Sequence, residues 1–144
     1  MGSLLQIDGL KVQIGQQTIC EALELDIKPG QSWALLGRNG AGKTTLLHYL
    51  AGLRSAGYSG SILLGGSELQ TLSARERARR IAVLLQHSSR GFGASVLETV
   101  LSGRHPHLSP LAWEGAADLA IARRYIAALD LDALADRSLA TLSG

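Results

Sequence analysis

The first thirty residues alternate between apolar and polar side chains. In Ala22–Ile27 the apolar residues are separated by acids, and Lys11–Ile14 repeats the alternation until Gly15 interrupts it. A period of two residues is typical of a strand with one buried face. Pro29 and Gly30 then form a turn signal. We therefore expect short antiparallel strands up to this turn.

Two later segments are apolar without alternation. Ser32–Leu36 is apolar from Trp33 onward, and Ile81–Leu85 is apolar throughout. Such runs predict central strands that are buried on both faces of a parallel sheet. A further strand is expected at Ser61–Leu64. The pattern thus predicts an antiparallel flank followed by a parallel core.

Helical periodicity begins after a glycine-rich loop. Leu46, Leu47 and Leu50 are spaced as on one helix face over Lys43–Leu50, and Gly52 is well placed to end that helix. Further along the chain, Ser73-Ala-Arg-Glu76 has the pattern of a capping box, which predicts a basic helix through Arg80.

The last third of the chain is predicted to be mainly helical. Val96–Leu101 suggests a short helix and Ala112–Leu129 a long one. The apolar stripe expected on the long helix consists of Ala117, Ile121, Tyr125, Ala128 and Leu129.

Composition limits the possible functions. The chain has 144 residues, 46% of them apolar, and a formal net charge of +2. This is enough for one packed domain, and the balanced charge without basic and aromatic clustering argues against nucleic acid as a partner. Cys20 is the single cysteine, which favours a reducing compartment. The N-terminus resembles no targeting signal, and no apolar run approaches the roughly 18 residues of a spanning helix. Any membrane role is therefore expected to depend on a partner.

The segment Gly37–Thr44 matches the phosphate-binding pattern G-x-x-x-x-G-K-[ST] in full. Glycines let the backbone fold tightly around phosphates with its N–H groups pointing inward, and the following helix adds the positive end of its dipole. The expected nucleotide-binding residues are Gly37, Arg38, Asn39, Gly40, Ala41, Gly42, Lys43, Thr44 and Thr45.

Three of these side chains have separate expected roles. Lys43 would place an ammonium between the β- and γ-phosphates of ATP, the Thr44 hydroxyl would bind Mg²⁺, and Thr45 would contact the α-phosphate. ATP and Mg²⁺ are the cofactors that this pattern implies.

A wider stretch resembles one family of P-loop proteins. Leu35–Leu47, followed by Leu50-Ala51-Gly52, is similar to the P-loop region of ATP-binding-cassette (ABC) ATPases. Gln86 falls where that family has its Q-loop glutamine. Leu142-Ser143-Gly144 resembles the first three residues of the family signature.

The resemblance implies a mechanism with two cassettes that sandwich two ATP molecules. Ser143 and the backbone of Gly144 would then meet the γ-phosphate of the ATP on a second subunit, most simply in a homodimer. Gln86 would join the Mg²⁺ shell. The implied catalytic residues are therefore Lys43, Gln86 and Ser143. The other implied partners are a membrane permease and, indirectly, a substrate-binding protein, which places the chain at the cytoplasmic face of the plasma (inner) membrane.

Two departures from the family pattern affect these expectations. Ile14 stands where the family usually has an aromatic residue that stacks on adenine, so base contact is expected to be weaker. The rest of the signature, the Mg²⁺-anchoring acid, the catalytic glutamate and the switch histidine are all expected beyond residue 144. By position, none of His48, His87, His105 and His107 replaces that histidine.

The segment Val96–His107 resembles the region after the Q-loop in importers of iron-siderophores, haem and cobalamin, although any cassette can carry an ordinary helix and loop here. The expected fold is α/β, with a P-loop core and β flank at residues 1–86. A helical subdomain and the start of the signature would occupy 87–144, so the chain would stop before the parallel sheet is complete. The expected function is ATP hydrolysis that drives solute import, while these 144 residues alone are expected to bind nucleotide without turning it over. The alternative is a truncated nucleotide-binding module without turnover.

Overall fold

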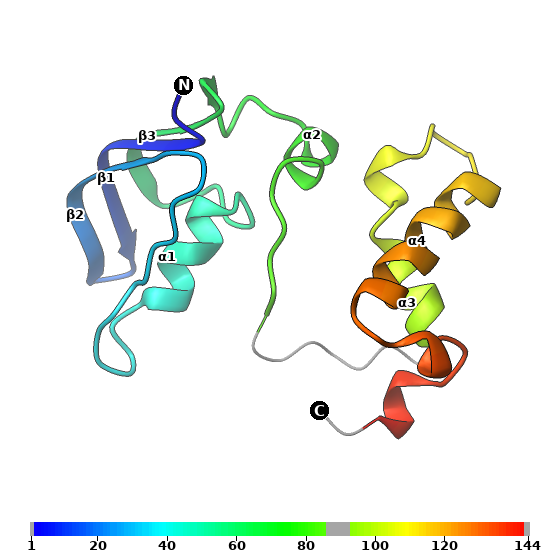
Figure 1. Cartoon of the computed structure of the whole chain (residues 1–144). Coiled ribbons are helices and arrows are strands. Elements are labelled where there is room, and N and C mark those ends of the chain that lie inside the picture. The colour runs from blue at the N-terminus through cyan, green and yellow to red at the C-terminus, as the bar shows by residue number, and fades with distance from the viewer. Residues whose placement is uncertain (1, 86–92, 143–144) are drawn as a thin grey trace. The chain divides into compact units, whose positions relative to one another are not determined.

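A computed structural model describes residues 2–85 and 93–142, and these form two compact units (Figure 1). The boundary lies between Val83 and Leu84. The boundary predicted after residue 86 lies outside the described residues. Each unit is described by itself below.

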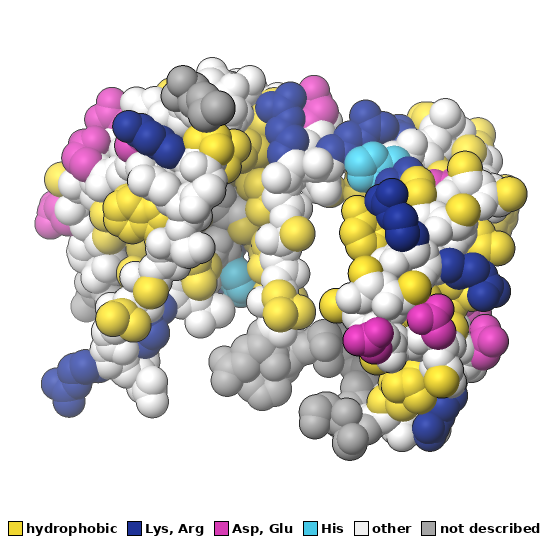
Figure 2. Space-filling model, viewed as in Figure 1, with side chains coloured by type: hydrophobic (Ala, Val, Ile, Leu, Met, Phe, Trp, Pro, Cys, Tyr) yellow, Lys and Arg dark blue, Asp and Glu magenta, His cyan; other side chains and the backbone are white. Residues whose placement is uncertain are grey.

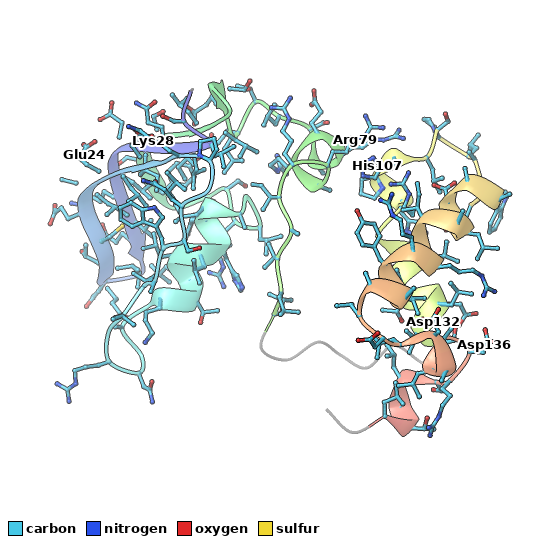
Figure 3. The ribbon with its side chains drawn as sticks, in the orientation of Figure 1. Glu24, Lys28, Arg79, His107, Asp132 and Asp136 are labelled. Carbon is cyan, nitrogen blue, oxygen red and sulfur yellow. The ribbon has the colours of Figure 1, made fainter. Side chains whose placement is uncertain are left out.

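The first unit is built on a four-stranded antiparallel sheet. Its strands are β1 (Leu5–Ile14), β2 (Gln17–Ile27), β3 (Tyr58–Leu64) and β4 (Ser67–Glu68), in the order β2-β1-β3-β4. The alternating N-terminal segments therefore form the antiparallel strands that their period predicts. In Figure 3, Glu24 lies on β2, where its Oε1 accepts a hydrogen bond of 2.7 Å from the Gly9 amide of β1.

Helix α1 (Lys43–Leu50) covers one face of this sheet (Figure 1). It buries Leu46 and Tyr49, whereas Leu47 is half exposed. Gly52 follows with φ of +69°, in agreement with its predicted place after the helix. The core of the unit consists of Ile7, Leu10, Val12, Leu46, Tyr49, Ile62, Leu64, Leu69 and Leu72.

The two apolar segments predicted as parallel strands form no strand. Ser32–Leu36 and Ile81–Leu85 have no regular secondary structure, and Leu36 and Leu84 are 87% and 98% exposed. The prediction was wrong because a central strand exists only when neighbours pair with its amides and carbonyls on both sides. Within residues 2–85 and 93–142, every strand pairing in the sheet is antiparallel and none involves these segments.

The predicted capping box opens helix α2 (Ala74–Ala78). The Glu76 amide donates to Ser73 Oγ at 3.2 Å, and the Ser73 amide donates to Glu76 Oε2 at 2.8 Å. The helix ends before Arg80, so it is shorter than predicted.

The second unit is helical, as predicted. It contains α3 (Val96–Ser102), α4 (Ala116–Ala128) and short 3₁₀ turns at His105–His107, Asp132–Leu134 and Leu139–Thr141. Its buried core consists of Val96, Ile126 and Ala135. Figure 3 shows His107 at one end of this unit and Asp132 and Asp136 at the other.

The buried face of α4 differs from the predicted stripe. Ala122 and Ile126 are buried, whereas Tyr125 and Leu129 are more than half exposed. The predicted stripe is one position away on the helix, which corresponds to a rotation of roughly 100°. The helix also begins at Ala116 rather than Ala112, so the expected Ala112–Leu129 helix was too long at its start.

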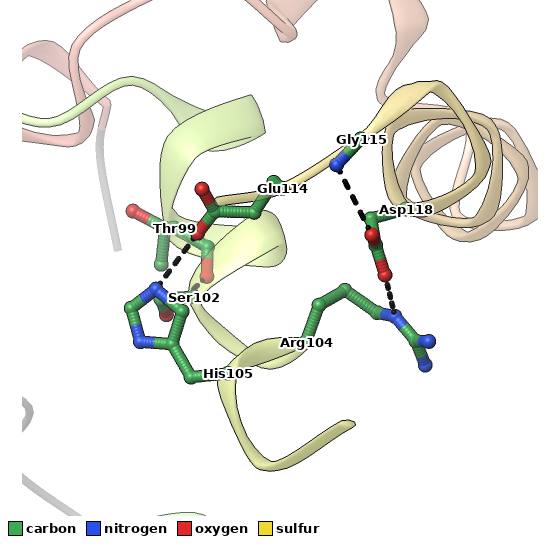
Figure 4. A network of polar contacts seen from close by, with 7 residues as sticks. All are labelled: Thr99, Ser102, Arg104, His105, Glu114, Gly115 and Asp118. Atoms are coloured by element: carbon green, nitrogen blue, oxygen red, sulfur yellow. Dashed lines mark hydrogen bonds and ion pairs between the residues drawn. The ribbon is translucent and has the colours of Figure 1, made fainter. Parts of the chain in front are cut away.

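Two polar pairs hold the connection between α3 and α4 (Figure 4). Arg104 Nε donates to Asp118 Oδ1 at 2.9 Å, and both side chains are mostly buried. The Gly115 amide donates to the other oxygen of Asp118 at 3.2 Å. His105 Nε2 lies 2.8 Å from Glu114 Oε1. The start of α4 is thus bonded to the residues that follow α3.

Candidate nucleotide-binding site

The predicted phosphate-binding residues form an exposed loop that leads directly into α1. Gly40 and Gly42 have φ of +80° and +87°, a region that other residues rarely adopt. The Ala41 amide donates to the Arg38 carbonyl at 3.2 Å, which closes a tight turn. The glycines are therefore required by the backbone conformation of the loop.

Gly42 also packs against strand β2. A Cβ added at this position would lie 2.6 Å from Cδ1 and 2.7 Å from Cγ2 of Ile19. Only a glycine lets the loop approach the sheet this closely. Ile19 of β2 thus packs against the loop at Gly42, and sequence reasoning missed this contact. Ile19 lies in β2 but outside the two alternating segments, Lys11–Ile14 and Ala22–Ile27, on which the strand prediction was based.

Lys43 is held by the same loop. Its Nζ donates to the carbonyl oxygens of Gly37 and Arg38, each at 2.8 Å. The structure therefore brings the first predicted residues of the motif together with its lysine. The ammonium lies beside the loop and not in the protein core.

The first turn of α1 presents backbone donors. No side chain caps Gly42, and the first turn contains no acid. The first amide with an intrahelical acceptor is that of Leu46, which donates to Gly42 at 2.8 Å. The amides of Lys43, Thr44 and Thr45 precede it at the positive end of the helix dipole. Free amides, glycines and one lysine together fit a polyphosphate group.

The remaining predicted site residues are only partly described. Ile14 is 39% exposed at the end of β1 and pairs with Gln17. It therefore belongs to the end of the β1–β2 hairpin that also carries Ile19. Gln86 and Ser143 lie outside the described residues.

Thr44 is the only predicted Mg²⁺ ligand within the described residues. Residues 2–85 and 93–142 contain no group of three or more histidine, cysteine or acidic side chains that could hold a metal ion. The exposed Thr44 hydroxyl fits a role as one Mg²⁺ ligand beside phosphate oxygens, because hard cations take oxygen ligands.

The chain is similar in sequence to bacterial proteins that share one name. The chain is 45% identical over 141 residues to the hemin import ATP-binding protein HmuV of Myxococcus xanthus, covering 97% of this chain and 51% of the relative. It is 41% identical over 142 residues to the protein of the same name from Pseudomonas aeruginosa, covering 98% of this chain and 53% of the relative. The chain thus spans about half the length of these relatives.

Solved structures have a similar fold. A putative metal-chelate type ABC transporter in an inward-facing conformation matches with a TM-score of 0.79 and 30% identity, covering 99% of this chain and 51% of the other. A nucleotide-free ATP-binding cassette from an ABC transporter matches with a TM-score of 0.81 at 22% identity, covering 98% and 59%, and this likeness shows the fold alone.

No helix among the described residues is both long and apolar enough to cross a bilayer. The model of the ABC transporter family matches residues 20–144, a range that includes the loop and α1. The chain therefore belongs to the ABC transporter family.

Proposed function

We propose that this chain is the ATP-binding and ATP-hydrolysing subunit of an ABC importer for hemin or a related metal chelate. One observation carries the proposal: the described loop fits a polyphosphate, within a chain aligned over almost its whole length to hemin import ATP-binding proteins. An iron-siderophore or cobalamin importer is the neighbouring possibility within the same class.

The phosphate-binding residues would have separate roles. Backbone amides from Gly37 to Gly42 and from the first turn of α1 would bind phosphate oxygens. Lys43 would exchange its two loop carbonyls for the β- and γ-phosphates, and Thr45 would contact the α-phosphate. Mg²⁺, held in part by Thr44, would neutralise the charge that develops during phosphoryl transfer.

The second set of roles rests on the family resemblance. Gln86 would complete the Mg²⁺ shell, and Ser143 would contact the ATP of a second subunit. The exposed segments Ser32–Leu36 and Ile81–Leu85 would form parallel strands when paired with further strands of a cassette. Such pairing would cover the hydrophobic side chains of these two segments, most of which are exposed in this chain (Figure 2).

The helical unit is the proposed contact with the membrane permease. The connection between α3 and α4 includes His107 and the nearly fully exposed Leu111 and Trp113. Exposed loops held by a rigid scaffold commonly carry binding residues. The permease would place the subunit at the cytoplasmic face of the membrane, with a substrate-binding protein acting indirectly.

Growth on defined iron sources tests the transport proposal. Deletion of the coding gene is expected to abolish growth on hemin and to spare growth on free iron salts. The wild-type gene is expected to restore growth, and a Lys43→Ala gene is not. A deletion strain that uses hemin normally but fails on a siderophore or lacks cobalamin uptake would redirect the solute assignment. Unimpaired use of all three would contradict the importer.

Crosslinking tests the permease contact. A cysteine at His107, with Cys20→Ser to remove the native thiol, is expected to capture the permease in membranes. Asp132→Cys, at the opposite end of the same unit, is the matched control (Figure 3). Capture from Asp132→Cys alone would contradict the proposed face. A phosphate-release assay on the purified chain tests the alternative, a nucleotide-binding module without turnover. Phosphate release that disappears in Lys43→Ala would contradict that alternative, and no release from the wild-type chain would support it.

A further inference from the structure

The first unit contains a polar cavity that is separate from the phosphate-binding loop. Its volume is about 290 Å³, and buried Leu69 lies among its walls. The polar side chains around it come from the segment after α1, from the strand β3, from the link that follows β4 and from α2. They are Arg54, Ser55, Tyr58, Gln70 and Arg77.

The hydroxyl of Tyr58 is the first sign that this cavity accommodates a ligand. The oxygen is buried and has no hydrogen-bond partner among the described residues. Its ring is fixed by an edge-to-face contact with Tyr49, with ring centroids 5.6 Å apart. Buried hydroxyls are nearly always hydrogen bonded, so an unpaired one beside a cavity points to a partner within that cavity, a water or a bound ligand.

Two guanidinium groups give the cavity its charge. Arg77 Nη1 donates to the Leu72 carbonyl at 2.5 Å, which fixes this side chain and uses one of its five N–H donors. The Arg54 guanidinium has no hydrogen bond or ion pair within residues 2–85 and 93–142. The backbone amide of Arg54 donates to the His48 carbonyl at 3.3 Å, which holds this residue at the C-terminal end of α1, where a cation is favoured by the helix dipole.

The neighbouring acids do not neutralise this charge. Glu68 accepts hydrogen bonds from Ser61 Oγ at 2.8 Å and from the Ile62 amide at 3.3 Å. Glu76 accepts from Ser73 in the capping box. Neither carboxylate is among the residues that line the cavity.

We propose that this cavity binds an oxyanion through Arg54, Arg77 and the Tyr58 hydroxyl. Guanidinium groups bind carboxylate and phosphate oxygens through paired N–H donors, and a buried hydroxyl donates a further bond. Gln70 and Ser55 contribute uncharged polar groups to the lining of the same cavity. The oxyanion is a free phosphate or a carboxylate from an acidic side chain of another protein. None of the lining residues belongs to the loop that is proposed to bind ATP.

The experiment maps binding on the whole chain by amide chemical shifts in a ¹H–¹⁵N spectrum. One arm titrates inorganic phosphate, and the other titrates the blocked dipeptide acetyl-Asp-Glu-amide. Because the assigned amides of 52–58 and 69–70 report the cavity and those of 37–45 report the loop, the two sites are separated in one titration. Saturable shifts in the first group are expected, and the tighter probe identifies the source of the oxyanion.

Three variants test the residues. Tyr58→Phe keeps the ring and removes the hydroxyl, and Arg54→Gln removes one charge. Each is expected to weaken binding at the cavity by about threefold to tenfold without changing the shifts of the loop. Arg80→Gln is the matched control, because Arg80 is exposed and lies outside the cavity lining. Shifts confined to 37–45, or equal weakening by Arg54→Gln and Arg80→Gln, would overturn the cavity site and leave the nucleotide site intact.

Discussion

The Nζ atom of Lys43 lies 2.8 Å from the carbonyl oxygen of Gly37, six positions earlier in the chain. A second bond of the same length joins it to the Arg38 carbonyl. The lysine thus closes the loop on itself. These two bonds hold its ammonium group near the start of α1, where the first helix amides have no intrahelical acceptor.

Replacement of Lys43 by alanine is expected to weaken ATP binding by about 1.5–3 kcal/mol, because a charge-assisted contact with phosphate is lost. Titration with a fluorescent ATP analogue in the presence of Mg²⁺ measures the change. Lys28→Ala removes an exposed lysine outside the motif and is expected to have little effect. Equal affinity for Lys43→Ala and the wild type would contradict the site.

The contact between Gly42 and Ile19 leads to a stability prediction. Gly42→Ala places a Cβ 2.6 Å from Ile19 Cδ1 at a φ of +87°, so we expect a loss of about 2–4 kcal/mol from strain and overpacking. Gly40→Ala has a similar φ of +80° but open space around the added Cβ, and is expected to cost only about 1–2 kcal/mol. Urea unfolding measures both.

A second substitution separates packing from backbone strain. Ile19→Ala removes the atoms that an alanine at Gly42 would contact. The double variant is therefore expected to lose less stability than the two single variants lose together, by about 1 kcal/mol or more. Strict additivity would show that Ile19 does not limit residue 42.

Local patterns predicted local structure well. The Ser73–Glu76 capping box needs only residues within one helical turn, and the structure forms both of its hydrogen bonds. Ser95 and Glu98 have the same spacing and form an equivalent box at the start of α3. That second box was not predicted, although its signal is equally plain in the sequence.

Structure that depends on distant partners was predicted less well. Ser32–Leu36 has the composition of a buried strand, but its state depends on neighbouring strands. The face of α4 depends on the pair Arg104–Asp118 and on α3, and no periodicity within the helix reports these. The phosphate-binding loop was located from sequence because its conformation is encoded by glycines within the motif. Its contact with Ile19 was not found, since that contact joins residues far apart in the chain.

Ile14 is expected to limit adenine recognition. The residue is partly exposed at the end of β1, on the hairpin whose Ile19 touches the loop. Base–aromatic stacking contributes roughly 1–3 kcal/mol, so Ile14→Tyr is expected to tighten ATP binding by a comparable amount. Leu4→Tyr, just before the opposite end of β1, is the control. No change in affinity on Ile14→Tyr would show that adenine is held by another residue.

Acid is expected to weaken the helical unit through Asp118. Hydrogen bonds from Arg104 and then from the Gly115 amide, with the charge of Arg104, lower the pKa of Asp118 below its ordinary value of 3.8. A lowered pKa means that the folded state favours the ionised carboxylate. This contribution to stability is therefore fully present above pH 3.8 and is lost as the pH falls through the lower folded-state value.

Asp118→Asn is expected to destabilise the unit at neutral pH and to flatten the fall in stability in acid. Urea unfolding followed by circular dichroism, repeated from neutral pH to below 3.8, measures both effects. Asp132→Asn, at an exposed aspartate without a salt bridge among the described residues, is expected to leave the acid dependence close to that of the wild type. An unchanged acid slope in Asp118→Asn would show that Arg104 and Gly115 do not stabilise the carboxylate in solution.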